Sequence, residues 1–400
     1  TEHTVIAWKW ARTVTSPNPA NPIEVPLVNS WWLSKKKGKE AWVRATVRDG
    51  RVHYEVVNDA NGPKGSEDGT MRRGNAVALG DGTPIDIKYI RSEAKAGRLG
   101  SQLMAVVAED KRRRLYLSPT GEQISSAQVE RPEDVPNQLI PTRNHDVDRL
   151  PMYGMPTWAD AFTNRQLVAL ATFSDLVGQA RQRVLEDALA AGMEEGESLE
   201  AGGAGARAYA DAIATYLALG VSRLADYSNS LATWDATRDS ATHLFTRQAI
   251  PMNWSFIEVN PFSGSSGNYS SLLNGICKVI LRIPANTVGS VIQASADARD
   301  YTGLVVSTDP PYYDNIGYSD LSDFFYVWLR RCLQGIHPSV VSTMLTPKAE
   351  ELVANPYRHD GKENAAKFFV DGFNTVFHRI RRGANPDVPM TVYYAYKQQD

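Results

Sequence analysis

One stretch constrains this chain more than any other: a short apolar run, then Asp-Pro-Pro-Tyr, then a helical pattern. The run "TGLVVST" ends at residue 308 and is followed by Asp309, Pro310, Pro311 and Tyr312. β-Branched residues in a short run bounded by turn residues predict a buried strand. Across residues 319–333 apolar side chains recur at helical spacing, which predicts an amphipathic helix with a core-facing aromatic side. We therefore expect a strand, a turn at Asp309 and a helix.

The last third of the chain, residues 251–400, repeats this alternation. Further strand-like runs are "SVIQASA" from residue 290 and "MTVYYAY" from residue 390, and a helical pattern occupies residues 364–382. Short β-branched runs that alternate with helices predict an α/β fold with a largely parallel sheet. Ligands of such sheets bind at the carboxyl ends of the strands, which is where we expect Asp309 to lie.

Two other parts precede this one. Residues 1–150 have the pattern of short strands and turns, with an Asp49-Gly50 hairpin signal and a second hairpin within residues 102–119. In residues 151–250 apolar side chains recur at helical spacing, and the segment "AGMEEGESLEAGGAGA" interrupts this pattern. The prediction is a β-rich module at 1–150, a helical layer at 151–250 and the α/β part at 251–400.

The charge and the cysteine content limit the kinds of partner and the cellular compartment that we expect for this chain. The chain has 43 Lys and Arg against 45 Asp and Glu, so no overall basic field points to nucleic acid. Local basic runs at residues 35–39, 111–114 and 378–382 permit a surface that faces phosphate. Cys277 and Cys332 are too few for a disulfide framework or a four-thiolate metal site, and we expect a cytoplasmic protein. No apolar run has membrane-spanning length, so no membrane partner is expected.

Asp-Pro-Pro-Tyr suits one kind of chemistry. The exocyclic amine of adenine is conjugated with its ring, so its lone pair attacks a methyl donor only when acceptors bind both N–H groups. Asp309 offers a carboxylate, and Pro310 restricts the backbone so that its own carbonyl is held toward a ligand. Tyr312 offers a ring on which an extruded base can stack. The alternative is a proline turn that merely ends a strand.

Five stretches of the chain resemble the large adenine-specific DNA methylases that carry a zinc-ribbon insert, a family that includes anti-phage methylases of the DISARM type. They are "KWARTVTSPNPANPIEVPLVNSWWLSKKKGK", "YGMPTWADAFTNRQLVALATFSDLV", "NPFSGSSGNY", "TDPPYYDNIGYSDLSDFFYVWLRR" and "YRHDGKENAAKFFVDGFNTVF". The resemblance implies S-adenosylmethionine as methyl donor, adenine in DNA as acceptor, and restriction-modification or phage defence as the setting. It also implies a catalytic tetrad of Asp309, Pro310, Pro311 and Tyr312.

The chain departs from that family in two ways. At the four positions where the family has what look like paired zinc-binding cysteines, this chain has Ser16, Asn21, Ala78 and Asp81. No metal is therefore expected. The family's glycine-rich donor loop lies upstream of the region resembled. We therefore expect this chain to be the carboxyl-terminal portion of such an enzyme, with the donor loop on a missing amino-terminal half or on a companion subunit.

Two further segments are candidates for contact with the donor. "NPFSGSSGN", residues 260–268, resembles a donor-binding glycine loop, although a serine-glycine turn that caps the next helix explains the same letters. Asp297 stands at the expected end of the "SVIQASA" strand, where it either contacts donor or substrate or is a solvated loop residue.

These observations predict part of a Rossmann-like methyltransferase sheet with a β-rich insert, which we expect to contact DNA, and a helical layer. The predicted activity is methylation of adenine N6 in DNA from S-adenosylmethionine. The alternatives are methylation of an amine in RNA, methylation of cytosine N4, and a DNA-binding subunit that has lost turnover.

Overall fold

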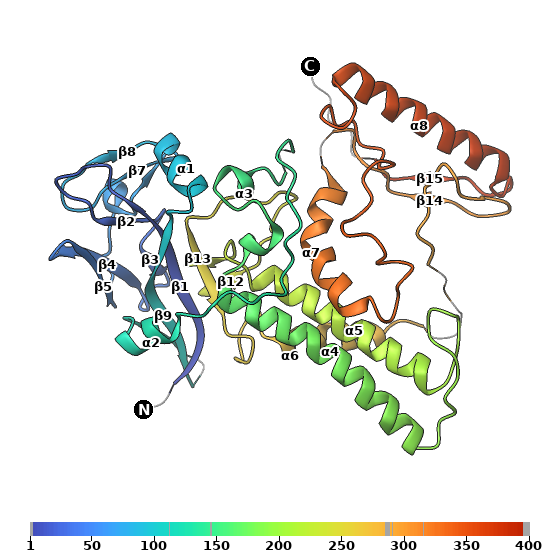
Figure 1. Cartoon of the computed structure of the whole chain (residues 1–400), viewed down its shortest axis with the longest axis horizontal. Helices are drawn as coiled ribbons and strands as arrows, with labels where there is room; N and C mark the ends of the chain where they lie inside the picture. The colour runs from blue at the N-terminus through green and yellow to red at the C-terminus, as the bar shows by residue number, and fades with distance from the viewer. Residues whose placement is uncertain are drawn as a thin grey trace.

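The computed structural model describes residues 3–111, 113–144, 146–284, 289, 291–314 and 316–394. The described residues form a mixed α/β structure (Figure 1). Its helices are α1 (Ile87–Lys95), α2 (Gly121–Ser126), α3 (Arg149–Met152), α4 (Asn164–Ala190), α5 (Ala206–Tyr227), α6 (Tyr269–Ile280), α7 (Tyr318–Leu333) and α8 (Lys362–Gly383).

The strands of the β-rich module are β1 (Thr4–Thr15), β2 (Glu24–Leu27), β3 (Trp32–Ser34), β4 (Ala41–Arg48), β5 (Arg51–Val57), β6 (Met71–Arg72), β7 (Asn75–Val77), β8 (Pro84–Ile85), β9 (Gly100–Asp110) and β10 (Arg113–Leu117). Later strands are β11 (Thr233–Asp235), β12 (Ser240–Thr242), β13 (Ser255–Val259), β14 (Ser307–Thr308) and β15 (Thr391–Val392).

An antiparallel sheet centred on β1 organises the amino-terminal part. Its order is β10-β9-β1-β13, and β2 pairs with the far end of β1. The long strand β1 is buried along most of its length because two layers of apolar residues cover it. The smaller sheets β3-β4-β5 and β6-β7-β8 lie beside it (Figure 1).

Both predicted hairpins are confirmed. β4 and β5 pair in antiparallel register around Asp49 and Gly50, whose φ angles of 50° and 69° are those of a type I′ turn. β9 and β10 form the second hairpin. In this module, the alternation of apolar and polar residues therefore correctly predicted the paired strands of both hairpins.

The helices expected within residues 151–250 are present. Helices α4 and α5 pack against each other, and α7 and α6 pack against α5 (Figure 1). A 3-10 turn at Trp158–Ala161 follows Thr157, and α4 begins only after a capping box formed by Thr163 and Gln166. The long helix therefore starts at Asn164, after the 3-10 turn and not within it.

The aromatic face of α7 is core, as its spacing predicted. Phe324 and Trp328 are fully buried. The Phe324 ring stacks on Phe162 at 5.3 Å between centroids, and Phe162 meets Trp328 edge to face at 5.4 Å. These contacts fix α7 to the segment that leads into α4.

The expected larger parallel sheet is not formed by the described residues. In the described part of the chain, the parallel pairing is that of β14 and β15, over two residues each. Residues 291–296 are not a strand, and residues 290, 395 and 396 of the predicted strands lie outside the described residues. Val291 is 101% exposed and Ile292 68% exposed, so no second layer covers that run. A parallel sheet is normally covered on both faces, which explains why these apolar runs do not form one here.

The three predicted parts are not separate in space. β13, from the third range, pairs with β1, and α7 packs on α4 and α5 from the second range. The division at residues 150 and 250 stays a prediction. Among the described residues, no helix is both long enough and apolar enough to cross a lipid bilayer.

Candidate catalytic loop

Asp309 lies directly after β14, at the carboxyl end of that strand (Figure 1). Two backbone hydrogen bonds extend the parallel pairing: Thr391 N–H donates to Val306 O at 3.0 Å, and Tyr393 N–H donates to Thr308 O at 2.8 Å. The strand direction and the pairing therefore agree with the predicted position of Asp309 at a strand end, although the pair is far shorter than expected.

The carboxylate and the aromatic ring of the predicted tetrad are in contact. The Tyr312 hydroxyl donates to Asp309 Oδ1 at 2.6 Å. The two linking residues, Pro310 and Pro311, are half-buried, and Asp309 is exposed. The ring of Tyr312 packs edge to face on Tyr394, with centroids 5.3 Å apart. The tetrad thus forms a small surface site with a carboxylate that solvent can reach.

The next residue, Tyr313, has a strained backbone. Its φ of 53° lies in the left-handed region, which bulky side chains rarely adopt. Such conformations typically cost about 1–3 kcal/mol and occur where surrounding contacts enforce them. Here Ala354 N–H donates to Tyr313 O at 3.0 Å, and the Tyr313 ring meets Phe369 of α8 at 5.2 Å. Contacts on both sides hold the loop in this conformation.

Gly317 connects the loop to α7 and fits closely against a buried polar cluster. Its N–H donates to Asp146 Oδ2 at 2.7 Å. A Cβ at this position would lie 2.9 Å from Asn144 Nδ2 and 3.1 Å from Asp320 Oδ2. The position therefore requires glycine because the backbone approaches these side chains too closely for any other residue.

Ion pairs fix the first turn of α7. The Ser319 N–H and hydroxyl donate to Glu351 at 2.8 Å and 2.6 Å, and Arg358 donates to Glu351 at 2.6 Å. Arg358 also bonds Asp320, which accepts from the Asn144 amide as well. Buried carboxylates need such partners because leaving one unpaired is strongly destabilising. This network is what positions the loop that carries Asp309.

A second ion pair lies one turn further along α7. Asp323 is fully buried, and Lys348 Nζ lies 2.7 Å from its Oδ2. Thr346 donates to Asp323 through its N–H at 2.9 Å and through its hydroxyl at 2.6 Å. Residues 346–358 are therefore attached to α7 at two successive turns.

Burial shifts two pKa values near the loop. Burial raises the pKa of Asp320 above its ordinary value, although Arg358 opposes the shift. Burial also raises the pKa of Tyr318, and the negative charges of Asp309 and Glu351 add to that effect. The Tyr318 hydroxyl thus stays protonated and lies within the electrostatic reach of Asp309.

Cavities flank the start of α7. One of about 700 Å³ has a basic lining of Arg143, Lys348, Arg358 and His359 around Asp320. Another of about 320 Å³ is lined by Ile316 and Tyr318, among others. Basic side chains around a concave surface favour phosphate groups. Lys348 and Arg358 are already paired with Asp323, Asp320 and Glu351, so much of this positive charge is neutralised locally.

Two of the basic runs noted in the sequence also meet. Lys36 and Lys39 from the first run and Arg114 from the second line a cavity of about 230 Å³ together with Arg238. Residue 112 of the second run lies outside the described residues. Arg114 is paired with Glu109 at 3.0 Å, and Lys36 with Asp239 at 3.2 Å, so part of the positive charge is neutralised locally.

The other predicted contacts with the donor have local roles. Asp297 lies in an exposed turn and not at a strand end, where it accepts from Ser295 Oγ at 2.6 Å. Residues 260–268 join β13 to α6, and Asn268 caps α6 by accepting from Ser271 N–H at 2.8 Å. The capping interpretation of that segment is confirmed, while its use as a donor loop stays untested.

The loops that carry Ser16 and Asn21, and Ala78 and Asp81, contact each other. Asn18 Nδ2 donates to Asp81 Oδ2 at 3.0 Å, which joins the loop at residues 16–21 to the loop at residues 78–82. The Thr83 backbone N–H, and next the Asn21 side chain, hold the pKa of Asp81 well below its ordinary value. Hydrogen bonds thus connect these two loops. No cluster of three or more His, Cys, Asp or Glu suited to a metal occurs among the described residues.

The anchoring residues Asp146, Glu351 and Arg358 were not predicted from the sequence. One signal could have found part of this network: Asp320 and Asp323 fall among the core positions of α7, where a charged residue needs a buried partner. The partners themselves come from segments more than 20 residues away, and no local pattern marks them.

No known protein family, curated protein or solved structure matches this chain. Its function must therefore be argued from its own residues.

Proposed function

We propose that this chain is the catalytic portion of a DNA methyltransferase that modifies adenine N6. The observation that carries the proposal is the position of Asp309: it follows a strand of a parallel pair at its carboxyl end, in contact with the Tyr312 of its own tetrapeptide. In α/β proteins that edge is where ligands bind. A methyltransferase role in restriction-modification or phage defence, within the zinc-ribbon adenine methylase family, is part of this proposal.

The chain's own residues would activate the amine. Asp309 accepts one N–H of the adenine amine, the Pro310 carbonyl accepts the other, and the ring of Tyr312 stacks on the extruded base. The lone pair of the nitrogen is then less delocalised into the purine ring. Acceptors that are already in place at the reacting group contribute through electrostatic preorganisation.

S-adenosylmethionine would supply the methyl group as an activated sulfonium. The described residues do not fit a complete site for it, because no glycine turn follows a strand of the parallel pair. A strand-turn-helix segment with glycines runs from β13 to α6, but its strand belongs to the antiparallel sheet. We therefore propose that the donor loop lies on another part of a longer protein or on a companion subunit.

Exposed apolar residues around β14 and β15 support a missing neighbour. Val305 and Tyr393 are 63% and 62% exposed, and Leu304 and Val392 are each 38% exposed. Side chains of this kind are normally covered in a parallel sheet. A further sheet portion that packs against this pair would cover them and would bring the donor loop to Asp309.

DNA as the partner is supported by Arg143 and His359 in the cavity beside the loop, whereas Lys348 and Arg358 of the same cavity are paired with carboxylates of their own. Phosphate contacts by such residues position a duplex but do not select its sequence. The contact between the loops at residues 16–21 and 78–82 supports the family resemblance, because it joins the two places where the family has its paired cysteines.

The experiment is methylation by the complete gene product in a host that lacks adenine methylation. Wild type should yield N6-methyladenine in host DNA by mass spectrometry. Asp309→Ala should lower the amount by about 10²–10³-fold, because one preorganised acceptor is removed from the reacting amine. The matched control is Asp371→Ala, which removes an exposed carboxylate from α8. Equal methylation by wild type and Asp309→Ala would refute the role of Asp309.

The same measurement separates the alternatives. N4-methylcytosine in the DNA, or a methylated amine in RNA and not in DNA, would identify the other amino-methyltransferase activities. DNA binding by the complete product without any methylated base would identify a subunit that has lost turnover. The contact of Tyr312 with Asp309 is compatible with that last alternative, since it engages one of the two carboxylate oxygens.

A further inference from the structure

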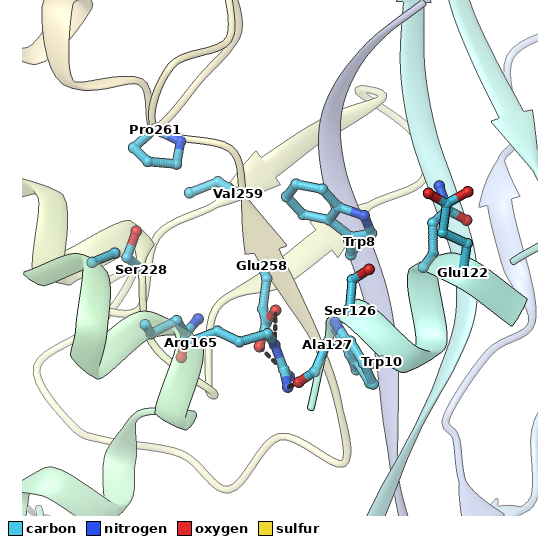
Figure 2. Close-up of a pocket in the computed structure, with 13 residues that line it drawn as sticks. Trp8, Trp10, Glu122, Ser126, Ala127, Arg165, Ser228, Glu258, Val259 and Pro261 are labelled. Carbon is cyan, nitrogen blue, oxygen red and sulfur yellow. Dashed lines mark hydrogen bonds and ion pairs between the residues drawn. The ribbon is translucent and has the colours of Figure 1, made fainter. Parts of the chain in front are cut away.

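A second cavity, of about 390 Å³, lies between β1, β13 and the starts of α2 and α4 (Figure 2). Its size falls within the range of small-molecule sites, and most of its lining is apolar with a few polar groups. It is formed by the antiparallel sheet and the helical layer, and its lining shares no residue with the loop that carries Asp309.

Two indoles line the β1 side of this cavity. Trp8 and Trp10 are two residues apart on one strand and therefore share a face of the sheet. The guanidinium of Arg165 lies 4.3 Å from the centroid of the Trp10 ring and covers it. Trp8 is half-buried, and Figure 2 shows its indole at the cavity wall between α2 and β13. Trp8 is thus the flat surface that the cavity offers to a ligand.

Two buried N–H donors of the lining have no hydrogen-bond partner in the described part of the chain. They are Trp10 Nε1 and Gln166 Nε2, on residues that are each 5% exposed. The amide oxygen of Gln166 accepts from Thr163 N–H at 2.9 Å, so the amide nitrogen is its unused end. Buried donors normally have acceptors, and their absence here points to an acceptor that a ligand supplies.

The charges at the base of the cavity are already matched to each other. Arg165 donates to both oxygens of Glu258, at 2.9 Å and 2.7 Å, and its third contact is Ala127 O at 2.7 Å. Thr163 Oγ1 also donates to Glu258 at 2.7 Å. Figure 2 shows this pair below Trp8, with Glu122 on the α2 side. A bidentate ion pair of this kind has a fixed geometry, and its two charges neutralise each other, so it attracts a charged ligand only weakly. The remaining carboxylate, on Glu122, disfavours an anion.

We infer that this cavity binds a neutral, planar heteroaromatic ring with hydrogen-bond acceptors on its edge, as in a purine base or nucleoside. The ring lies against Trp8, and its edge accepts from Trp10 Nε1 and Gln166 Nε2. Indole faces suit such rings, and stacking tolerates different bases. The inference uses none of the residues of the Asp309 site, although Pro261 of the lining belongs to the segment at residues 260–268 that resembles a donor loop.

The test is titration of residues 1–400 with adenosine, followed by calorimetry and by saturation-transfer NMR. A ligand of this size in such a site should bind with Kd of roughly 0.1 mM. Adenosine 5′-monophosphate should bind at least about fivefold more weakly, because its phosphate meets uncompensated negative charge. No DNA or methyl transfer enters the measurement, so its outcome is separable from that of the methylation assay.

Variants locate the site. Trp8→Ala should weaken binding by roughly tenfold through loss of stacking. Gln166→Met keeps the length of the side chain and removes the donor, so it should also weaken binding. The matched control is Trp42→Ala, which removes an indole on β4 that stacks with Arg44 at 5.1 Å and does not line the cavity. Thermal unfolding of each variant checks that it is folded.

Three results would overturn the inference. One is the absence of saturable binding by wild type up to about 5 mM. Another is adenosine binding that Trp8→Ala and Gln166→Met both leave unchanged while they remain folded. The third is binding of S-adenosylmethionine at least tenfold tighter than adenosine, which would show that the cavity recognises the methionine part and not the ring.

Discussion

Buried charged residues determine much of the local geometry in this chain. Lys9 and Glu258 are each 6% exposed, Asp320 is 2% exposed and Asp323 is fully buried. Each has a specific partner, such as the Trp32 carbonyl that accepts from Lys9 Nζ at 3.2 Å. An unpaired buried charge destabilises the folded state, so each of these residues requires its partner to be present and in position. These residues are therefore where single substitutions should have the clearest effects.

Lys9 gives a prediction about pH. Burial lowers its pKa from 10.5 to about 8. Between pH 8 and the pKa of the unfolded chain, the unfolded state binds a proton that the folded state has lost, so stability rises with pH. The free energy of unfolding of wild type should rise by about 2 kcal/mol between pH 8 and pH 9.5, relative to Lys9→Met. Urea unfolding at both pH values measures this difference, and Lys88→Met, on the exposed surface of α1, is the control.

Gly317 gives a second prediction at this scale. Gly317→Ala would place a methyl group 2.9 Å from Asn144 Nδ2, so either the loop or the buried cluster must move. Such overpacking typically costs about 1–3 kcal/mol. Gly335→Ala is the matched control because a Cβ there meets nothing within 4 Å. Urea unfolding of both variants is the measurement, and equal stabilities would show that the cluster does not hold the loop.

At the scale of elements, the sequence predicted what local periodicity determines. The helix at residues 318–333 and the turn at Asp49 and Gly50 follow from spacing and from turn chemistry within a few residues. The strand expected at residues 302–308 could not be predicted in the same way. A parallel strand needs neighbouring strands and covering layers that its own residues do not specify. The Asp-Pro-Pro-Tyr segment could be singled out from the sequence as a candidate site, but its anchors Asp146 and Arg358 could not, since they come from distant segments.

The two linked loops of the β-rich module give a prediction for that element. Asn18 and Asn21 contact Asp81, so the two loops that carry the four replaced positions touch, and the proposed family resemblance places one metal ion between them. The variant Ser16→Cys, Asn21→Cys, Ala78→Cys and Asp81→Cys should bind one zinc ion per chain, with Zn–S distances of about 2.3 Å.

Elemental analysis and X-ray absorption of the purified variant measure the zinc content and the ligand distances. A variant with cysteine at only two of these positions should bind zinc much more weakly, because a structural site needs four ligands. A four-cysteine variant that is folded and holds no more zinc than wild type would contradict the proposed correspondence with the zinc-ribbon family.

At the scale of the whole molecule, the amino-terminal sheet and the helical layer have extensive cores, whereas the end that carries Asp309 does not. Among the described residues of α8, only Ala365 and Ile380 are buried, and Val370 is 52% exposed. The β14-β15 pair is two residues long on each strand. Local stability follows buried apolar contact, so this end should open more readily than the rest.

The exposed residues of that end give the last prediction. Apolar side chains on an unpaired strand edge favour association with other chains. Residues 1–400 should therefore self-associate as concentration rises, in sedimentation velocity. Burying one valine contributes about 1.5–3 kcal/mol, so Val305→Lys should raise the dissociation constant by at least roughly tenfold. Leu176→Lys is the control, because it changes a residue that is 46% exposed on α4. If wild type stays monomeric, or if both variants weaken association equally, the β14-β15 surface is not the site at which a partner packs.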